Sequence, residues 1–160
     1  MRNPIPLFFL LVLSTACQQN EKSTQLASNE VDAGRKFLRA ALDGKFDVAK
    51  EYLLPDSLNL NYLDIASRGY DRLSQTDKEN YKGASIIIHE NKNENDSITL
   101  LIFSNSFKND RDTLRILKRD KNWFVDLSYL YVHPSTTKQP WIVPSFLFLL
   151  AEVQVQLFDT

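Results

Sequence analysis

The residues of this chain that could do chemistry are one cysteine, two histidines and scattered carboxylates and tyrosines. Cys17 could be a nucleophile, a disulfide partner or an attachment point. Histidine and carboxylate side chains can in general accept or donate protons. No spacing among these residues is diagnostic of catalysis, so each is weighed by the element that carries it.

Cys17 lies where an apolar run gives way to polar residues. Arg2 supplies a positive charge, residues 7–13 are apolar without interruption, and residues 14–16 are small. This order is typical of a secretory signal peptide. The run is far shorter than the roughly 20 apolar residues that span a bilayer. We therefore expect residues 1–16 to be a signal peptide that is removed.

A catalytic or disulfide role does not suit Cys17. One cysteine cannot form a disulfide within the chain, and a nucleophile on a flexible terminus lacks a positioned base. The stretch LSTAC, residues 13–17, resembles the lipobox of bacterial lipoproteins, in which small residues precede a cysteine that is lipidated. An ordinary signal peptidase could also cut after Ala16, just before Cys17.

The lipoprotein resemblance implies an exported protein that is attached to a membrane through acyl chains, such as palmitate, on Cys17. Burial of acyl chains contributes about 0.8 kcal/mol per methylene, so two or more chains hold a protein on the membrane. Gln18 stands where some inner-membrane lipoproteins have Asp, which favours the outer membrane. The polar residues up to Asn29 are then a flexible tether, which makes 17–29 the lipidated cysteine and tether.

The apolar spacing of the next segments predicts helices. Residues 29–44 should form the first, with Asn29 as N-cap and Gly44 at its end. A second, short helix is expected over 45–54, because the following proline disfavours helix in the residue before it. A third is expected over 56–73.

A last helical turn is predicted before the periodicity changes. Thr76 stands three residues before Glu79, which is the spacing of a capping box, and Gly83 should end the turn.

Four runs rich in β-branched and aromatic residues follow. The polar turns between them are short, and short turns join antiparallel neighbours, so the runs predict a four-stranded meander. Trp123 and Val125 should face the helices, whereas Asp126 should face solvent. The runs are residues 84–90, 97–107, 112–119 and 122–131, separated by turns at 91–96, 108–110 and 119–121.

Helices followed by a meander predict an α+β domain, with helices packed on a curved antiparallel sheet. This order and the ending DTLRILKRDKNWFVDL, residues 112–127, resemble the cystatin-like cone fold of the nuclear-transport-factor-2-like superfamily. They also resemble small bacterial lipoproteins of unknown function with that fold. Trp123 follows a charged turn, as in the last hairpin of such proteins, and Asn122 stands where glycine is common. The resemblance covers residues 30–131.

The cone resemblance implies a pocket between helices and sheet, in which some members of the superfamily work as isomerases or dehydratases. These enzymes use an acid or a histidine as base together with tyrosine hydroxyls, for which His89 is the histidine candidate. Fold analogy is a weak warrant for catalysis, so we expect no enzyme activity here. Asp64 and Asp126 are further acid candidates, without a defined role. The residues that could line the pocket are Trp123, Tyr62, Tyr70 and His89.

Composition argues against several other classes of function. The formal net charge of −1 gives no general attraction to nucleic acid. The widely separated histidines provide no local zinc ligands. The Asn-rich segment 91–102 lacks the glycine and glutamate of a calcium loop, and a chain with four glycines has no phosphate loop. We expect no cofactor.

Residues 132–160 lie beyond the resemblance and combine a proline-containing linker with an apolar segment. The apolar residues of 145–158 fit either a helical face or, at their end, a strand. They could pack on the domain itself, or form an exposed patch for a partner, a second copy or the membrane.

The sequence thus predicts a lipid-anchored cell-envelope binding or interaction module. Its ligand would be a protein partner or a small apolar molecule in the cone. The alternatives are an enzyme that uses the cone pocket and a purely structural envelope component.

Overall fold

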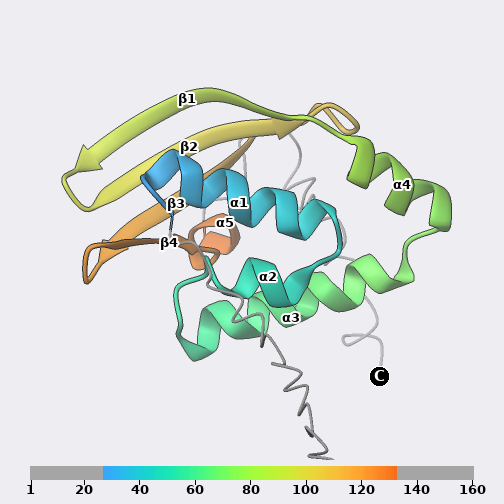
Figure 1. The fold of residues 1–160 in the computed structure, drawn as a ribbon, viewed down its shortest axis with the longest axis horizontal. Helices are drawn as coiled ribbons and strands as arrows, with labels where there is room; N and C mark the ends of the chain where they lie inside the picture. Colours follow the sequence, from blue (N-terminus) through green and yellow to red (C-terminus); the bar gives the residue numbers. More distant parts are fainter. Residues whose placement is uncertain (1–26, 133–160) are drawn as a thin grey trace, which may run out of the picture.

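The computed structural model describes residues 27–132, in which helices precede a sheet and a short helix follows it (Figure 1). The predictions for the signal peptide, Cys17, most of the tether and residues 133–160 lie outside the described residues. The α+β class is confirmed. The elements are α1 Glu30–Leu42, α2 Phe46–Lys50, α3 Ser57–Arg72, α4 Gln75–Gly83, β1 Ile86–Asn95, β2 Ile98–Asn105, β3 Asp112–Arg119, β4 Asn122–Asp126 and α5 Ser128–Val132.

The first helix has the predicted N-cap and ends at Leu42, two residues before Gly44. The Asn29 side chain accepts a hydrogen bond of 2.8 Å from the backbone N–H of Asp32, which satisfies a donor that the first turn leaves open. Gly44 has a φ of +74°, a conformation that favours glycine, and the chain turns there into α2. Local sequence signals are sufficient to fix this helix.

The fourth helix begins earlier than predicted. Its N-cap is Ser74, whose hydroxyl oxygen accepts the Asp77 N–H at 3.1 Å. The Ser74 hydroxyl also donates to the Asp77 carboxylate at 2.8 Å. The predicted capping box at Thr76 and Glu79 is therefore wrong, because the pair two residues upstream caps the helix. Both pairs have the same spacing, and only the structure selects between them.

The four strands form an antiparallel meander in the order β1-β2-β3-β4, as predicted. The first turn is much shorter than expected, since β1 continues to Asn95 and most of the predicted turn 91–96 is strand. Thr99 and Asn93 are partners across β1 and β2, and the Thr99 hydroxyl donates to the Asn93 side chain at 2.9 Å. The two polar side chains therefore satisfy each other within the strand pair.

The last strand is shorter than predicted. Val125 and Asp126 close β4, and the residues that were expected to extend it form α5 instead. The Asp126 carboxylate accepts both the N–H and the hydroxyl of Ser128, at 3.0 and 2.6 Å. Such local bonds compete with the strand ladder and turn the chain.

Helix α1 packs on one face of the sheet, which we call the inner face. Its approach is close at Gly34, where an added Cβ would lie 2.7 Å from a methyl carbon of Leu101 on β2. Between helix and sheet lies one hydrophobic core. Its fully buried side chains include Phe37, Leu38, Leu53, Leu101, Leu114, Ile116 and Val125.

Gly44 should be far more sensitive to substitution than Gly83. Alanine at this position would have to adopt a positive φ, and its Cβ would clash with a ring carbon of the buried Tyr70. We expect Gly44→Ala to lower the free energy of unfolding by about 2–4 kcal/mol. Urea denaturation followed by circular dichroism would measure this change.

Gly83→Ala is the matched control, because no heavy atom lies within 4 Å of its added Cβ. Alanine at the end of α4 should leave stability unchanged or raise it by up to about 1 kcal/mol. Equal losses in the two variants would contradict the assigned role of Gly44.

Candidate functional site

The four residues predicted to line a pocket do not converge in the structure. His89 lies on β1 and contacts the Ser104 hydroxyl at 2.8 Å, on the sheet face turned away from α1. Trp123 is half-buried next to the last hairpin, with the Lys118 ammonium 5.3 Å from its ring centroid. Tyr62 and Tyr70 belong to α3. None of these four residues lines the depression between α1 and α2.

Tyr70 serves mainly as a packing residue. Its side chain is buried, and its ring meets that of Phe46 edge to face, with centroids 5.7 Å apart. Its hydroxyl has no hydrogen-bond partner among the described residues. Burial and the nearby Asp43 raise the pKa of Tyr70, so the hydroxyl stays protonated. The ring holds α3 against the turn at Gly44.

The prediction that Asp126 faces solvent is wrong. Only 2% of the residue is exposed. Its carboxylate accepts hydrogen bonds from Arg115 Nε at 2.9 Å, from Asn59 Nδ2 at 3.3 Å and from Ser128. The Asn59 side chain in turn accepts the Leu127 N–H at 2.6 Å. We call Asp126, Arg115, Asn59 and Ser128 the acid network.

The acid network holds the Asp126 carboxylate in its ionised form. Burial raises the pKa of its carboxyl, but the hydrogen bonds from Ser128 and Arg115 and the positive charge of Arg115 more than compensate and hold the pKa below its usual range. The carboxylate oxygens are occupied by these donors. Strand alternation predicted the face of Asp126 but not the residues of α3 and α5 that cover it.

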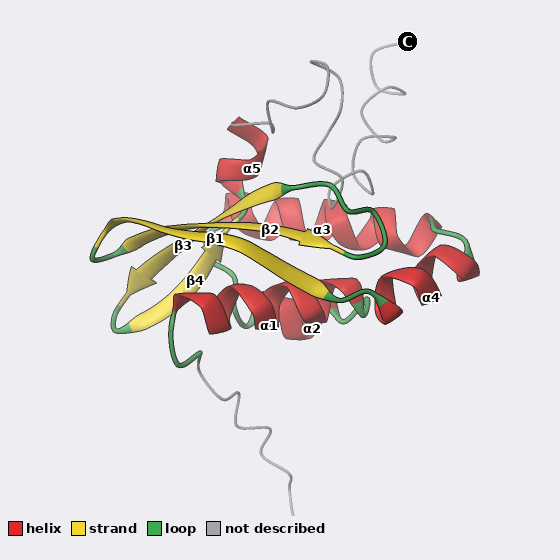
Figure 2. Cartoon of the chain, turned by 90° about the horizontal axis from the view of Figure 1, so that it is seen from above, coloured by secondary structure: helices red, strands yellow, loops and turns green. Residues whose placement is uncertain are grey.

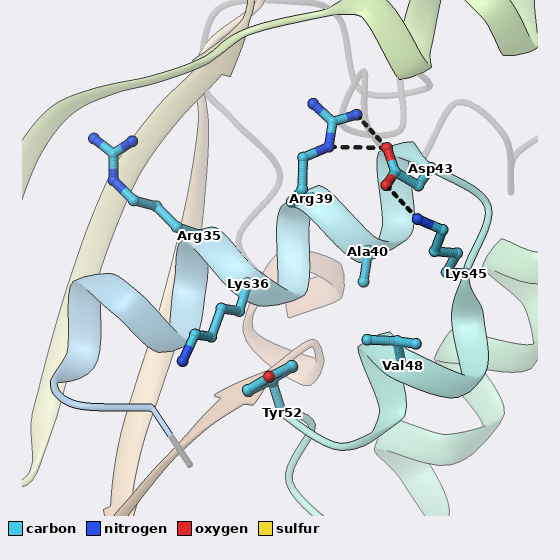
Figure 3. Close-up of a pocket in the computed structure, with 8 residues that line it drawn as sticks. All are labelled: Arg35, Lys36, Arg39, Ala40, Asp43, Lys45, Val48 and Tyr52. Atoms are coloured by element: carbon cyan, nitrogen blue, oxygen red, sulfur yellow. Dashed lines mark hydrogen bonds and ion pairs between the residues drawn. The ribbon is translucent and has the colours of Figure 1, made fainter. Parts of the chain in front are cut away.

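A different site lies on the helical layer, where α1, α2 and Tyr52 surround a depression of about 410 Å³ (Figure 3). We call it the helix groove. Ala40, Val48 and the Tyr52 ring give it apolar walls, and charged side chains stand around them. The lining residues are Arg35, Lys36, Arg39, Ala40, Asp43, Lys45, Val48 and Tyr52.

The helix groove carries more positive than negative charge. Four of its lining residues are cationic, and Asp43 is the one acid among them. Lys45 Nζ lies 3.1 Å from an Asp43 oxygen, and Arg39 Nε donates to the other oxygen at 2.9 Å. Burial raises the pKa of Asp43, but these two cations outweigh that effect and lower it. Asp43 therefore stays ionised and orients two of the cations.

Arg39 also has a structural task. It donates to the backbone carbonyls of Ala84 at 2.7 Å, Lys82 at 3.1 Å and Tyr81 at 3.2 Å, which joins α1 to the end of α4. Arg35 and Lys45 are exposed, and they do not join α1 to α4 in the way that Arg39 does. They are the groove cations best placed to meet a partner.

Sequence reasoning did not find the helix groove. The spacing of Arg35, Lys36 and Arg39 could have shown a basic stripe on the first helix. Nothing in the sequence could show that Lys45 and Tyr52 would line the same depression as α1, because α2 and the residues after it are placed by tertiary packing.

Comparisons with protein-family models, curated proteins and solved structures give no match for this chain. Among the described residues, no helix is long and apolar enough to cross a bilayer. The same part of the chain holds no group of three or more histidine, cysteine and acidic residues that could bind a metal ion.

Proposed function

We propose that this chain is a lipid-anchored cell-envelope protein whose nuclear-transport-factor-2-like domain binds a protein partner through the helix groove. The observation that carries this proposal is the combination of apolar walls and exposed cations in one depression. Such a surface suits a partner segment that presents a hydrophobic side chain flanked by carboxylates.

The anchor supports a partner in the same envelope. Cys17 ends a signal-like segment, and α1 begins after a tether of only a dozen residues. A flexible coil of that length has an end-to-end distance of about 20 Å. The helix groove then stays close to the bilayer, where envelope proteins are at a high effective concentration.

The form of the groove favours a protein over a small molecule. Sites for small ligands enclose most of the ligand surface, whereas the helix groove is a depression that is broadly open to solvent. Its exposed cations can pair with acidic side chains at the rim of an interface and set its orientation. A binding role also fits the engagement of Asp126 in the acid network, because this occupies one of the two acid candidates of the enzyme alternative.

Site-specific photocrosslinking in cells would test this function. A photoreactive residue at Arg35 in the anchored full-length chain should give defined adducts with an envelope protein. Lys45→Glu should reduce those adducts at least tenfold, since a reversed charge repels an acidic partner. Lys92→Glu is the matched control, because it reverses an exposed lysine on β1, away from the groove.

Two outcomes would contradict the binding proposal. One is equal loss of adducts in the Lys45→Glu and Lys92→Glu variants, which would indicate a general effect of charge. The other is the absence of any adduct from Arg35 while the protein is anchored and folded.

A further inference from the structure

The sheet face turned away from α1, which we call the outer face, is apolar over its centre. Cross-strand neighbours in an antiparallel sheet share a face. The register pairs Leu100 with Arg115, and Arg115 contacts Asp126 on this side. Alternation along each strand then places six apolar side chains on the same face. They are Ile87, Ile98, Leu100, Ile102, Leu117 and Phe124.

The outer face is not part of the core beneath α1. Leu100 is only 9% exposed, yet it does not belong to the hydrophobic cluster between the helices and the sheet. Ile87 is 39% exposed, and Ile102 is half-buried. An apolar surface of this kind on a sheet is typically a contact site for another chain, a membrane or a further segment of the same chain.

The chain itself leaves the described domain on this side. Helix α5 packs against β3, and the Tyr129 ring centroid lies 5.2 Å from the Arg115 guanidinium on the outer face. Figure 2 shows α5 on the opposite side of the sheet from α1 and α2. Because α5 ends at Val132, the following residues start beside the outer face.

The length of the following segment is sufficient. Residues 133–140 can span about 26 Å at roughly 3.3 Å per extended residue, which matches the length of an eight-residue strand such as β2. Residues 141–158 can therefore reach any part of the outer face. Their only charged residue is Glu152.

Strand addition at the edges of the sheet fits this segment less well. The edge of β4 is already paired, since Val125 donates to the Tyr52 carbonyl and accepts from the Leu54 N–H, both at 2.8 Å. The second half of β1 is exposed and polar, as is typical of protected edge strands. The face offers apolar contact, whereas the edges do not.

We propose that the outer face is the docking surface for residues 141–158 of the same chain. Docking would cover the six apolar side chains and would bury the apolar residues of the segment within its own domain. The helix groove would remain open for the partner, because it lies on the other side of the sheet.

Intramolecular photocrosslinking of the anchored full-length chain would test the docking. A photoreactive residue at Ile102 should give a product of monomer mass in which its peptide is joined to residues 141–158. The same group at Asp47, an exposed residue of α2, should give no such product. A dimer product from Ile102 would assign the face to a second copy instead, and a lipid adduct would assign it to the membrane. Either result, or no product, would overturn the proposal.

Substitutions in the segment provide a second test. Leu149→Asp should abolish the crosslink from Ile102 and speed amide hydrogen exchange in β2, with α1 unchanged. Gln154→Asp introduces the same charge at a residue that is already polar and should retain the crosslink. Equal crosslinking of both variants and the unaltered chain would show that apolar docking does not hold the segment.

Discussion

Asp126→Ala should lower the free energy of unfolding by about 2–4 kcal/mol, because it removes the buried acceptor of several hydrogen bonds and the partner of the half-buried Arg115. The substitution leaves Arg115 without its carboxylate and takes acceptors from Asn59 and Ser128. Because whole domains have stabilities of only about 5–15 kcal/mol, the midpoint of urea denaturation should fall markedly.

Asp64→Ala is the matched control for this prediction. Asp64 pairs with Arg68 one turn along α3, but both side chains are at least half exposed. Exposed pairs of this kind contribute little, so the loss should stay within about 0.5 kcal/mol. A small loss in both variants would mean that the acid network does not hold α3 and α5 to the sheet.

The acid network should also appear in the pH dependence of stability. The folded pKa of Asp126 is below its unfolded value, so the folded state favours the charged form. Its contribution is present above the unfolded pKa of about 3.9 and is lost as the pH falls through the folded pKa. Denaturation curves measured between pH 6 and pH 2, as a rough range, should show a smaller loss of stability for Asp126→Ala than for the unaltered chain.

Cys17→Ser should release the protein from membranes. Acyl chains contribute about 0.8 kcal/mol per buried methylene, so two or more chains give stable attachment that the variant lacks. Fractionation of cells together with metabolic labelling by palmitate would measure both attachment and its cause. The unaltered chain should incorporate label and sediment with membranes.

Ser14→Ala is the control for the anchor, because it keeps a small residue in the LSTAC stretch. This variant should remain labelled and membrane-bound. If Cys17→Ser still sediments with membranes, the anchor is the segment 141–158 or a retained signal segment. That result would remove the lipoprotein part of the proposed function.

Local sequence signals determined much of this domain. Asn29 and Gly44 bound the first helix by capping and by a positive φ, interactions that involve only near neighbours in the chain. The order of helices before a four-stranded meander also follows from periodicity and short turns. These features need no knowledge of how distant segments meet.

Tertiary structure decided the environment of the functional candidates. Asp126 alternates correctly with Val125, but its burial depends on Asn59, which is 67 positions away in the chain. The helix groove likewise requires Tyr52 to lie against Lys36, whose ammonium is 5.8 Å from the tyrosine ring centroid. A side-chain pattern gives the face on which a residue lies, whereas burial, ion pairing and depressions depend on which elements pack against that face. For this reason the sequence predicted the order of helices and strands, and only the folded chain revealed the helix groove.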